Sequence, residues 1–110
     1  MTRPRRPTAV FAGADIVAMG VLEAVTEAGR SVPDDISVAG YDNTTFAALG
    51  PISLTSVDQA GHDMGHSAVR LLLDRITDRH RPATRVVLSP TLVPRRTTAP
   101  PAEQGPLPLM

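Results

Sequence analysis

The feature that most constrains the fold is a short apolar run with a proline before it and a glycine after it. Ile36, Val38 and Ala39 form the run, Pro33 precedes it and Gly40 ends it. The run is too short for a stable helix, and the proline prevents a helix from continuing into it. The pattern therefore predicts a buried strand of an α/β sheet.

Polar side chains follow this predicted strand directly. Tyr41, Asp42 and Asn43 offer a ring, a carboxylate and an amide just past its carboxyl end, which is where open α/β sheets usually bind their ligands. Asp and Asn are equally typical of an ordinary turn. The stretch by itself leaves both interpretations open.

A helix connects this strand to an earlier one. Residues 8–12 are a predicted strand, Asp15 is a suitable N-cap, and residues 16–28 have helical periodicity that ends at Gly29. Strand, helix and strand in this order predict a right-handed βαβ unit. The residues that we expect this helix to bury are Val17, Ala18, Val21, Leu22, Val25 and Ala28.

The second half of the chain contains weaker signals and one long helix. Residues 44–51 suggest a single helical turn, and residues 52–57 alternate between apolar and hydroxyl side chains, as a half-buried strand does. Residues 60–77 form an amphipathic pattern, and residues 85–89 and 91–97 are predicted extended pieces. The expected apolar stripe of the long helix consists of Met64, Ala68, Leu71, Leu72 and Ile76.

Composition excludes several classes of protein. The chain has 110 residues, which suits one small domain, and its formal net charge of zero gives no overall nucleic-acid or anionic-membrane signature. It has no cysteine and, because all eleven basic residues are arginine, no lysine, so thiolate chemistry and a phosphate-binding P-loop are excluded. No apolar run reaches the length of a membrane-spanning helix. Residues 1–7 and 99–110 are rich in proline and predict disorder.

Three predicted strands end in polar residues that could form one binding edge. Asp15, the pair Asp42 and Asn43, and the pair Asp58 and Gln59 follow these strands. Parallel neighbouring strands would bring the side chains together, where short carboxylates and amides can bind adjacent hydroxyl groups. Capping and turn residues that never meet remain the alternative.

Two histidines raise the question of a metal site. His62 and His66 lie four residues apart on the predicted long helix, the spacing of a zinc-binding helix. A zinc site needs a further ligand, which a single acid or His80 at unknown distance does not establish. No catalytic serine motif occurs either. We therefore predict no metal, no cofactor and no enzymatic activity.

Six stretches of the chain carry a family resemblance: residues 7–15, Ala18-Met19-Gly20, residues 32–42 with the Gly40-Tyr41-Asp42 ending, residues 54–59, Met64-Gly65 and residues 92–98. Together they resemble the C-terminal third of LacI/GalR-family transcription regulators. The similarity runs from Pro7 to about Pro100. It implies an α/β fold, namely part of the periplasmic-binding-protein type I fold, a Rossmann-like three-layer arrangement, and mainly its C-terminal lobe.

The resemblance also implies a division of the chain and its site residues. Within residues 8–98, it assigns 8–58 to the C-terminal lobe, 59–94 to a piece of the N-terminal lobe and 95–98 to a strand that crosses back. The effector contacts that we predict are Asp42, Gln59, Asp15 and Tyr41. Because Ala14 replaces the polar residue usual before Asp15, a plain sugar effector is less expected. The dimer contacts that the resemblance implies are Met19, Leu22, Phe46 and Leu49.

The predicted function follows from these assignments. We expect an effector-sensing fragment of a LacI-type regulator that binds a small polar ligand, of the sugar or nucleoside class, to control DNA binding in the full-length family. No helix-turn-helix precedes Thr8, so we expect a shortened regulator that reaches DNA only through a reader absent from this chain. The expected setting is the cytoplasm, without a membrane, as a homodimer or as a mixed dimer with a related regulator. The alternatives are a solute-binding module of the same fold and a dimerising interaction fragment that binds no ligand.

Overall fold

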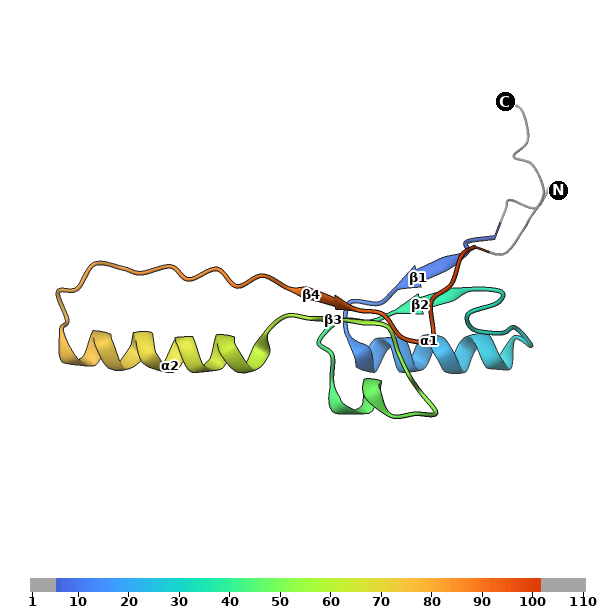
Figure 1. Ribbon diagram of the computed structural model, residues 1–110, viewed down its shortest axis with the longest axis horizontal. Helices are drawn as coiled ribbons and strands as arrows, with labels where there is room; N and C mark the ends of the chain where they lie inside the picture. The colour runs from blue at the N-terminus through green and yellow to red at the C-terminus, as the bar shows by residue number, and fades with distance from the viewer. Residues whose placement is uncertain (1–5, 102–110) are drawn as a thin grey trace, which may run out of the picture.

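The computed structural model describes residues 6–101 and consists of a folded body and a projecting arm (Figure 1). We define the arm as residues 61–90 and the body as residues 8–60 and 91–101. The radius of gyration is 19.9 Å and the extents are 65 × 38 × 22 Å, whereas a compact chain of this length has a radius near 13 Å. The arm causes this elongation.

The elements alternate between strands and helices through most of the chain. In order they are β1 (Ala9–Phe11), α1 (Asp15–Glu27), β2 (Ser37–Ala39), the 3₁₀-helix η1 (Thr45–Ala48), β3 (Ser56–Asp58), α2 (Gly61–Thr77) and β4 (Thr91–Val93).

The centre of the body is the predicted βαβ unit. β1 and β2 are parallel, with Val10 opposite Val38, and α1 connects them. The other edge of β2 meets the chain just before β3, through a parallel bridge between Ala39 and Thr55. Thr97 also lies against β2, where its carbonyl accepts a hydrogen bond of 2.9 Å from the Val38 amide.

The core of the body is small and lies on the α1 side of the sheet. Its buried apolar residues are Ala12, Ala18, Val38, Ala47 and Leu54, with Val21, Leu22, Val32 and Ile52 packed against them. No helix covers the opposite face within residues 6–101, as Figure 1 shows. Phe11 on that face is 67% exposed. An α/β sheet normally carries helices on both faces, whereas in residues 6–101 a helix covers only one side of this sheet.

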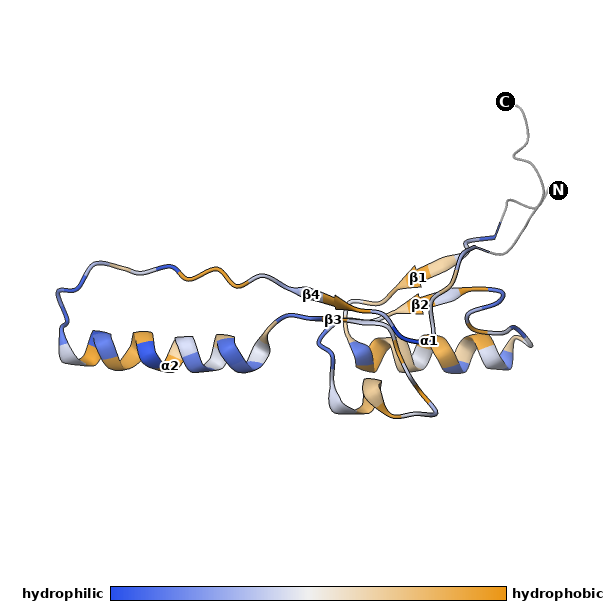
Figure 2. Ribbon diagram, in the orientation of Figure 1, coloured by the Kyte–Doolittle hydropathy of each residue, from blue (hydrophilic) through white to orange (hydrophobic). Residues whose placement is uncertain are grey.

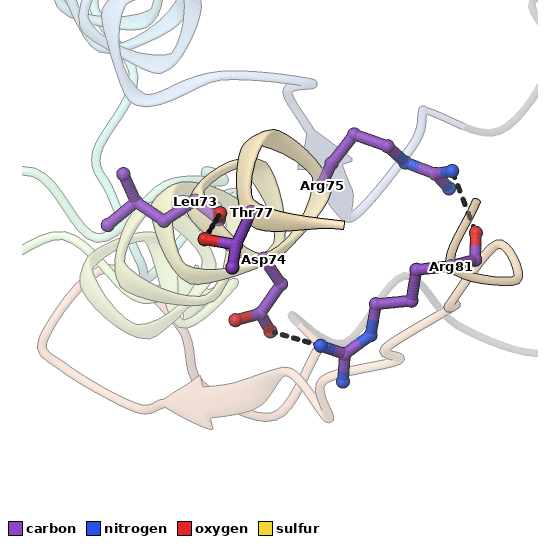
Figure 3. A network of polar contacts seen from close by, with 5 residues as sticks. All are labelled: Leu73, Asp74, Arg75, Thr77 and Arg81. Carbon is purple, nitrogen blue, oxygen red and sulfur yellow. Dashed lines mark hydrogen bonds and ion pairs between the residues drawn. The ribbon is translucent and has the colours of Figure 1, made fainter. Parts of the chain in front are cut away.

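α2 makes no tertiary core. None of its residues is buried, although Figure 2 shows apolar residues along its second half. Figure 3 shows how the turn after α2 is held: Arg75 donates to the Arg81 carbonyl at 2.7 Å, and Arg81 pairs with Asp74 at 3.6 Å. The Thr77 hydroxyl, in the last turn of α2, donates to the Leu73 carbonyl at 3.0 Å. Neither helix of the described chain is long and apolar enough to cross a bilayer.

Most predicted elements are present, and Gly29 has the expected left-handed backbone, with a φ of 72°. The prediction of a half-buried, alternating strand over 52–57 is wrong. Ser53 has a φ of 44°, the strand is only Ser56–Asp58, and Leu54, Thr55 and Ser56 are all buried. They are buried because α1, η1 and the returning chain surround them.

Three smaller expectations are also wrong. Residues 85–89 form no strand, because they have no neighbouring strand to pair with in the described chain. Val17 is 54% exposed and Ala28 is exposed, so residues 6–101 do not bury that side of α1. Ala99 is held to Ser37 by two hydrogen bonds, so order extends into the predicted tail. Of the predicted disordered ends, residues 1–5 and 102–110 lie outside the described residues.

Candidate functional site

Asp42 and Gln59 meet at the carboxyl end of the sheet. Asp42 follows β2 and Gln59 follows β3, and the Gln59 amide donates to the Asp42 carboxylate at 2.7 Å. Asp42 is exposed and Gln59 is half-buried. A carboxylate and an amide side by side can accept from and donate to neighbouring hydroxyl groups or ring nitrogens of a small ligand.

The backbone around Asp42 is held in an unusual conformation. Asp42 and Asn43 have φ values of 112° and 51°, a region that non-glycine residues rarely adopt and that surrounding contacts must enforce. The Asp42 amide donates to the Val57 carbonyl at 2.9 Å. The Asn43 amide donates to the Ser56 hydroxyl at 2.9 Å, and its side chain donates to Asp58 at 3.2 Å. The loop is therefore tied to β3 at three points.

Arg95 connects this loop to the chain that returns from the arm. Its guanidinium donates to the Leu54 carbonyl at 2.9 Å and to the Asn43 side-chain oxygen at 2.8 Å. The Arg95 amide also donates to the Thr55 hydroxyl at 2.8 Å. The returning chain is thus part of the site's support. The sequence showed Arg95 only as one of a basic pair near the C-terminus, and nothing in it indicated this contact.

Asp15 is buried and acts inside the body. The helix begins at Asp15 and its N-cap is Ala14, which makes no side-chain cap, so the prediction that Asp15 caps α1 is wrong. One carboxylate oxygen accepts from the amide and the hydroxyl of Thr44, both at 2.7 Å. The other oxygen accepts from the Ser56 hydroxyl at 2.6 Å.

These contacts argue against Asp15 as an effector contact. The residue has no exposed surface, and its two oxygens together already accept three hydrogen bonds. The carboxylate also benefits from the positive end of α1. Asp15 links α1, the loop after Asp42 and β3, and its buried carboxylate supports the loop that carries Asp42.

The remaining predicted site residues are spread over the body. Tyr41 is half-buried, and its carbonyl accepts from the Asp15 amide at 2.9 Å. Among the predicted dimer residues, Met19 and Phe46 are half-buried and Leu49 is 55% exposed. Leu22 packs against the core, so only part of its surface is available to a partner.

The histidine pair does not develop into a metal site. His62 and His66 are exposed on α2, and no cluster of three or more His, Cys, Asp or Glu residues suited to a metal exists in residues 6–101. The candidate site at the sheet edge is a set of hydrogen-bonding groups.

Residues 1–98 match the family of periplasmic binding protein-like domains. The chain belongs to that family. The match covers most of the sequence and agrees with the parallel α/β arrangement of the body, which is part of the periplasmic-binding-protein fold.

Similar proteins are bacterial regulators. The HTH-type transcriptional repressor PurR of Pectobacterium carotovorum is 46% identical over 99 residues, which is 90% of this chain and 29% of that protein. A LacI transcriptional regulator from a Rhodococcus species has 40% sequence identity and a TM-score of 0.85, covering 92% of this chain and 37% of the other. A LacI-family regulator from Enterococcus faecium with bound ribose has 36% identity and a TM-score of 0.77, covering 84% and 35%.

These likenesses identify the chain as a fragment of the sensor domain of LacI-family transcription regulators, as the sequence motifs predicted. The chain spans less than a third of the length of the curated relative. Transcriptional repressors of this family are not enzymes, which agrees with the prediction that the chain carries no catalytic site.

Proposed function

We propose that this chain supplies one wall of an effector-binding cleft, with Asp42 and Gln59 as the contacts to a small polar ligand of the sugar or nucleoside class. In the full-length family such binding would control attachment to DNA in the cytoplasm. The observation that carries the proposal is the exposed Asp42–Gln59 pair, joined at 2.7 Å at the carboxyl end of the sheet.

The support around the pair strengthens this proposal. A loop with two positive φ values costs free energy, of the order of 1–3 kcal/mol per residue, and here it is held by β3 and by Arg95. Such a loop presents the Asp42 carboxylate in one fixed direction. Fixed polar groups lower the entropic cost of binding a ligand. The bound ribose of the Enterococcus faecium regulator is consistent with a sugar-like effector.

A second feature concerns assembly. Leu49 is exposed and Met19 and Phe46 are half-buried on the body, so these residues can contribute to a homodimer or to a mixed dimer with a related regulator. This pairing does not require an effector. It is therefore also what we would expect of the alternative function, a dimerising interaction fragment that binds no ligand.

The test is a titration of the purified chain with ribose, cellobiose and a set of nucleosides. We expect dissociation constants in the millimolar range or no heat in calorimetry, because a single wall contacts a small ligand on one side only. In nuclear magnetic resonance spectra, which detect such weak binding, the amides of Asp42 and Gln59 should shift. Asp42→Asn should abolish the shifts, whereas the exposed control Asp34→Asn should preserve them.

A micromolar dissociation constant would contradict the single-wall proposal. Shifts that survive Asp42→Asn, or that cluster far from Asp42, would show that the contact lies elsewhere. A solute-binding module of the same fold would bind its ligand tightly without any link to a regulator.

A further inference from the structure

A cavity lies beside the last two turns of α1, at the amino end of β2. Its volume is about 660 Å³, which falls within the range of pockets that bind small molecules. Four segments of the body line it, namely α1, the connection to β2 at residues 30–33, the loop at Pro51 and Ile52, and the returning chain at Arg96 and Thr97. The Asp42–Gln59 pair lies at the carboxyl end of the same strand, so the cavity is a separate feature of the body.

Hydrogen bonds within the body hold the walls of this cavity. The Ser31 amide donates to the Asp35 carboxylate at 2.7 Å, and the Asp35 amide donates to the Ser31 carbonyl at 2.9 Å. The Arg96 amide donates to the Ser53 carbonyl at 3.0 Å, and the Arg96 guanidinium donates to the Gly50 carbonyl. The connection, the loop and the returning chain are therefore fixed around the cavity, and fixed walls lower the entropic cost of binding a ligand.

The lining of the cavity is positively charged. Arg30 and Arg96 line it, and no acidic residue of the described chain does. The Arg30 side chain makes no hydrogen bond or ion pair within residues 6–101, and Arg96 keeps further N–H groups beside the one that Gly50 accepts. The carboxyl end of α1 adds roughly half a negative charge, which is less than the two full charges of the guanidinium groups.

The rest of the wall is mainly apolar. Leu22, Val32 and Ile52 line the cavity and also pack against the core. Pro33 and Pro51 add rigid apolar surface. A cavity with an apolar wall and two cationic groups suits a ligand that has an apolar body and one anionic group.

We propose that this cavity binds a small organic carboxylate with an apolar body about the size of an aromatic ring. The carboxylate pairs with Arg30 and with the N–H groups that Arg96 keeps, because the planar guanidinium group matches the geometry of a carboxylate. The apolar body lies against Leu22 and Ile52. This binding requires neither the Asp42–Gln59 pair nor its ligand.

The test is a titration of the full chain with phenylacetate at neutral pH, followed by the amide signals in nuclear magnetic resonance spectra. We expect the amides of Ser31, Ile52 and Thr97 to shift. Phenylacetamide has the same ring without the charge, and inorganic phosphate has the charge without the ring. Each should bind at least about fivefold more weakly than phenylacetate. Added salt should weaken the binding of phenylacetate, because the ion pairs are exposed to solvent.

Substitutions locate the binding charge. Arg30→Gln removes a side chain that has no partner in the described chain, so the body should fold normally. We expect it to weaken phenylacetate binding about twofold to fivefold, as the loss of an exposed ion pair does. Arg96→Gln should weaken it by a similar factor. The control Arg85→Gln removes the same charge from the exposed arm and should leave binding unchanged, as should Asp42→Asn at the other end of β2.

The proposal is overturned if phenylacetate shifts no amide, or if the shifted amides lie outside the lining of the cavity. It is also overturned if phenylacetamide or phosphate binds as tightly as phenylacetate, or if Arg85→Gln weakens binding as much as Arg30→Gln does. Weaker binding in both cavity variants, with unchanged binding in Arg85→Gln and Asp42→Asn, supports it.

Discussion

Removal of the Asp15 carboxylate should destabilise the body more than any other single charge change. Asp15 has no exposed surface and accepts hydrogen bonds from the amide and hydroxyl of Thr44 and from the hydroxyl of Ser56. A hydrogen bond to a charged acceptor contributes about 1.5–3 kcal/mol, and a buried donor left without a partner costs about 1–3 kcal/mol. Burial of the carboxylate offsets part of the sum. We expect Asp15→Ala to lower the free energy of unfolding by about 3–5 kcal/mol.

Asp15→Asn separates hydrogen bonding from charge. An asparagine can keep its carbonyl oxygen towards the two donors of Thr44 and turn its amide towards the oxygen of Ser56, which can accept as well as donate. Only the charge assistance and the favourable position at the start of α1 are lost. The expected loss is about 1–1.5 kcal/mol.

The assay is urea unfolding followed by circular dichroism at the helix band, with Asp34→Ala as the control. Asp34 is an exposed acid of the same chain, and its removal should change the free energy of unfolding by no more than about 0.5 kcal/mol. The reasoning is refuted if Asp15→Ala unfolds at the same urea concentration as Asp34→Ala. It is also refuted if Asp15→Asn is as damaging as Asp15→Ala, because hydrogen-bond geometry would then not be the cause.

Two further predictions use the same measurement. Gly40→Ala should destabilise the body by at least about 2 kcal/mol, since a Cβ at Gly40 would lie 2.3 Å from an oxygen of Asp15 and 3.2 Å from its Cα. A Cβ at Gly20, on an open side of α1, would meet no atom within 4 Å, so Gly20→Ala should stabilise the body by up to about 1 kcal/mol. An equal loss of stability at both glycines would contradict the packing argument. Arg95→Ala should lower the free energy of unfolding by about 2 kcal/mol, because it removes two guanidinium hydrogen bonds, and it should shift the Asn43 amide signal in nuclear magnetic resonance spectra. The control Arg85→Ala, on the exposed arm, should do neither. An unchanged Asn43 signal would refute the support that we assign to Arg95.

The strand-helix-strand unit could be predicted from sequence because its signals are local. Gly29 ends α1 and Pro33 blocks its continuation, while the apolar run before Gly40 makes β2, and each of these depends on backbone preferences of neighbouring residues. The polar ending at Asp42 was visible for the same reason. Its partner Gln59 could be named from the family motifs, but the hydrogen bond between the two residues could be seen only in the structure.

The errors arise where a residue's role depends on distant chain. Asp15 has the identity of a helix cap, and it serves as an internal acceptor because Thr44 and Ser56 are brought to it by the loop and by β3. Residues 85–89 have the composition of a strand and form none, because a strand requires a neighbour.

The sequence by itself determined the class of fold, the order of its elements and the family, because periodicity, turn residues and motifs are read along the chain. Only the tertiary structure decided which polar residues face solvent and which are consumed inside: Asp42 lies exposed beside Gln59, and Asp15 is enclosed. It also showed that the arm and the open sheet face have no partner within the described chain. Burial is a property of what surrounds a residue in space, and residues far apart in the sequence supply those surroundings.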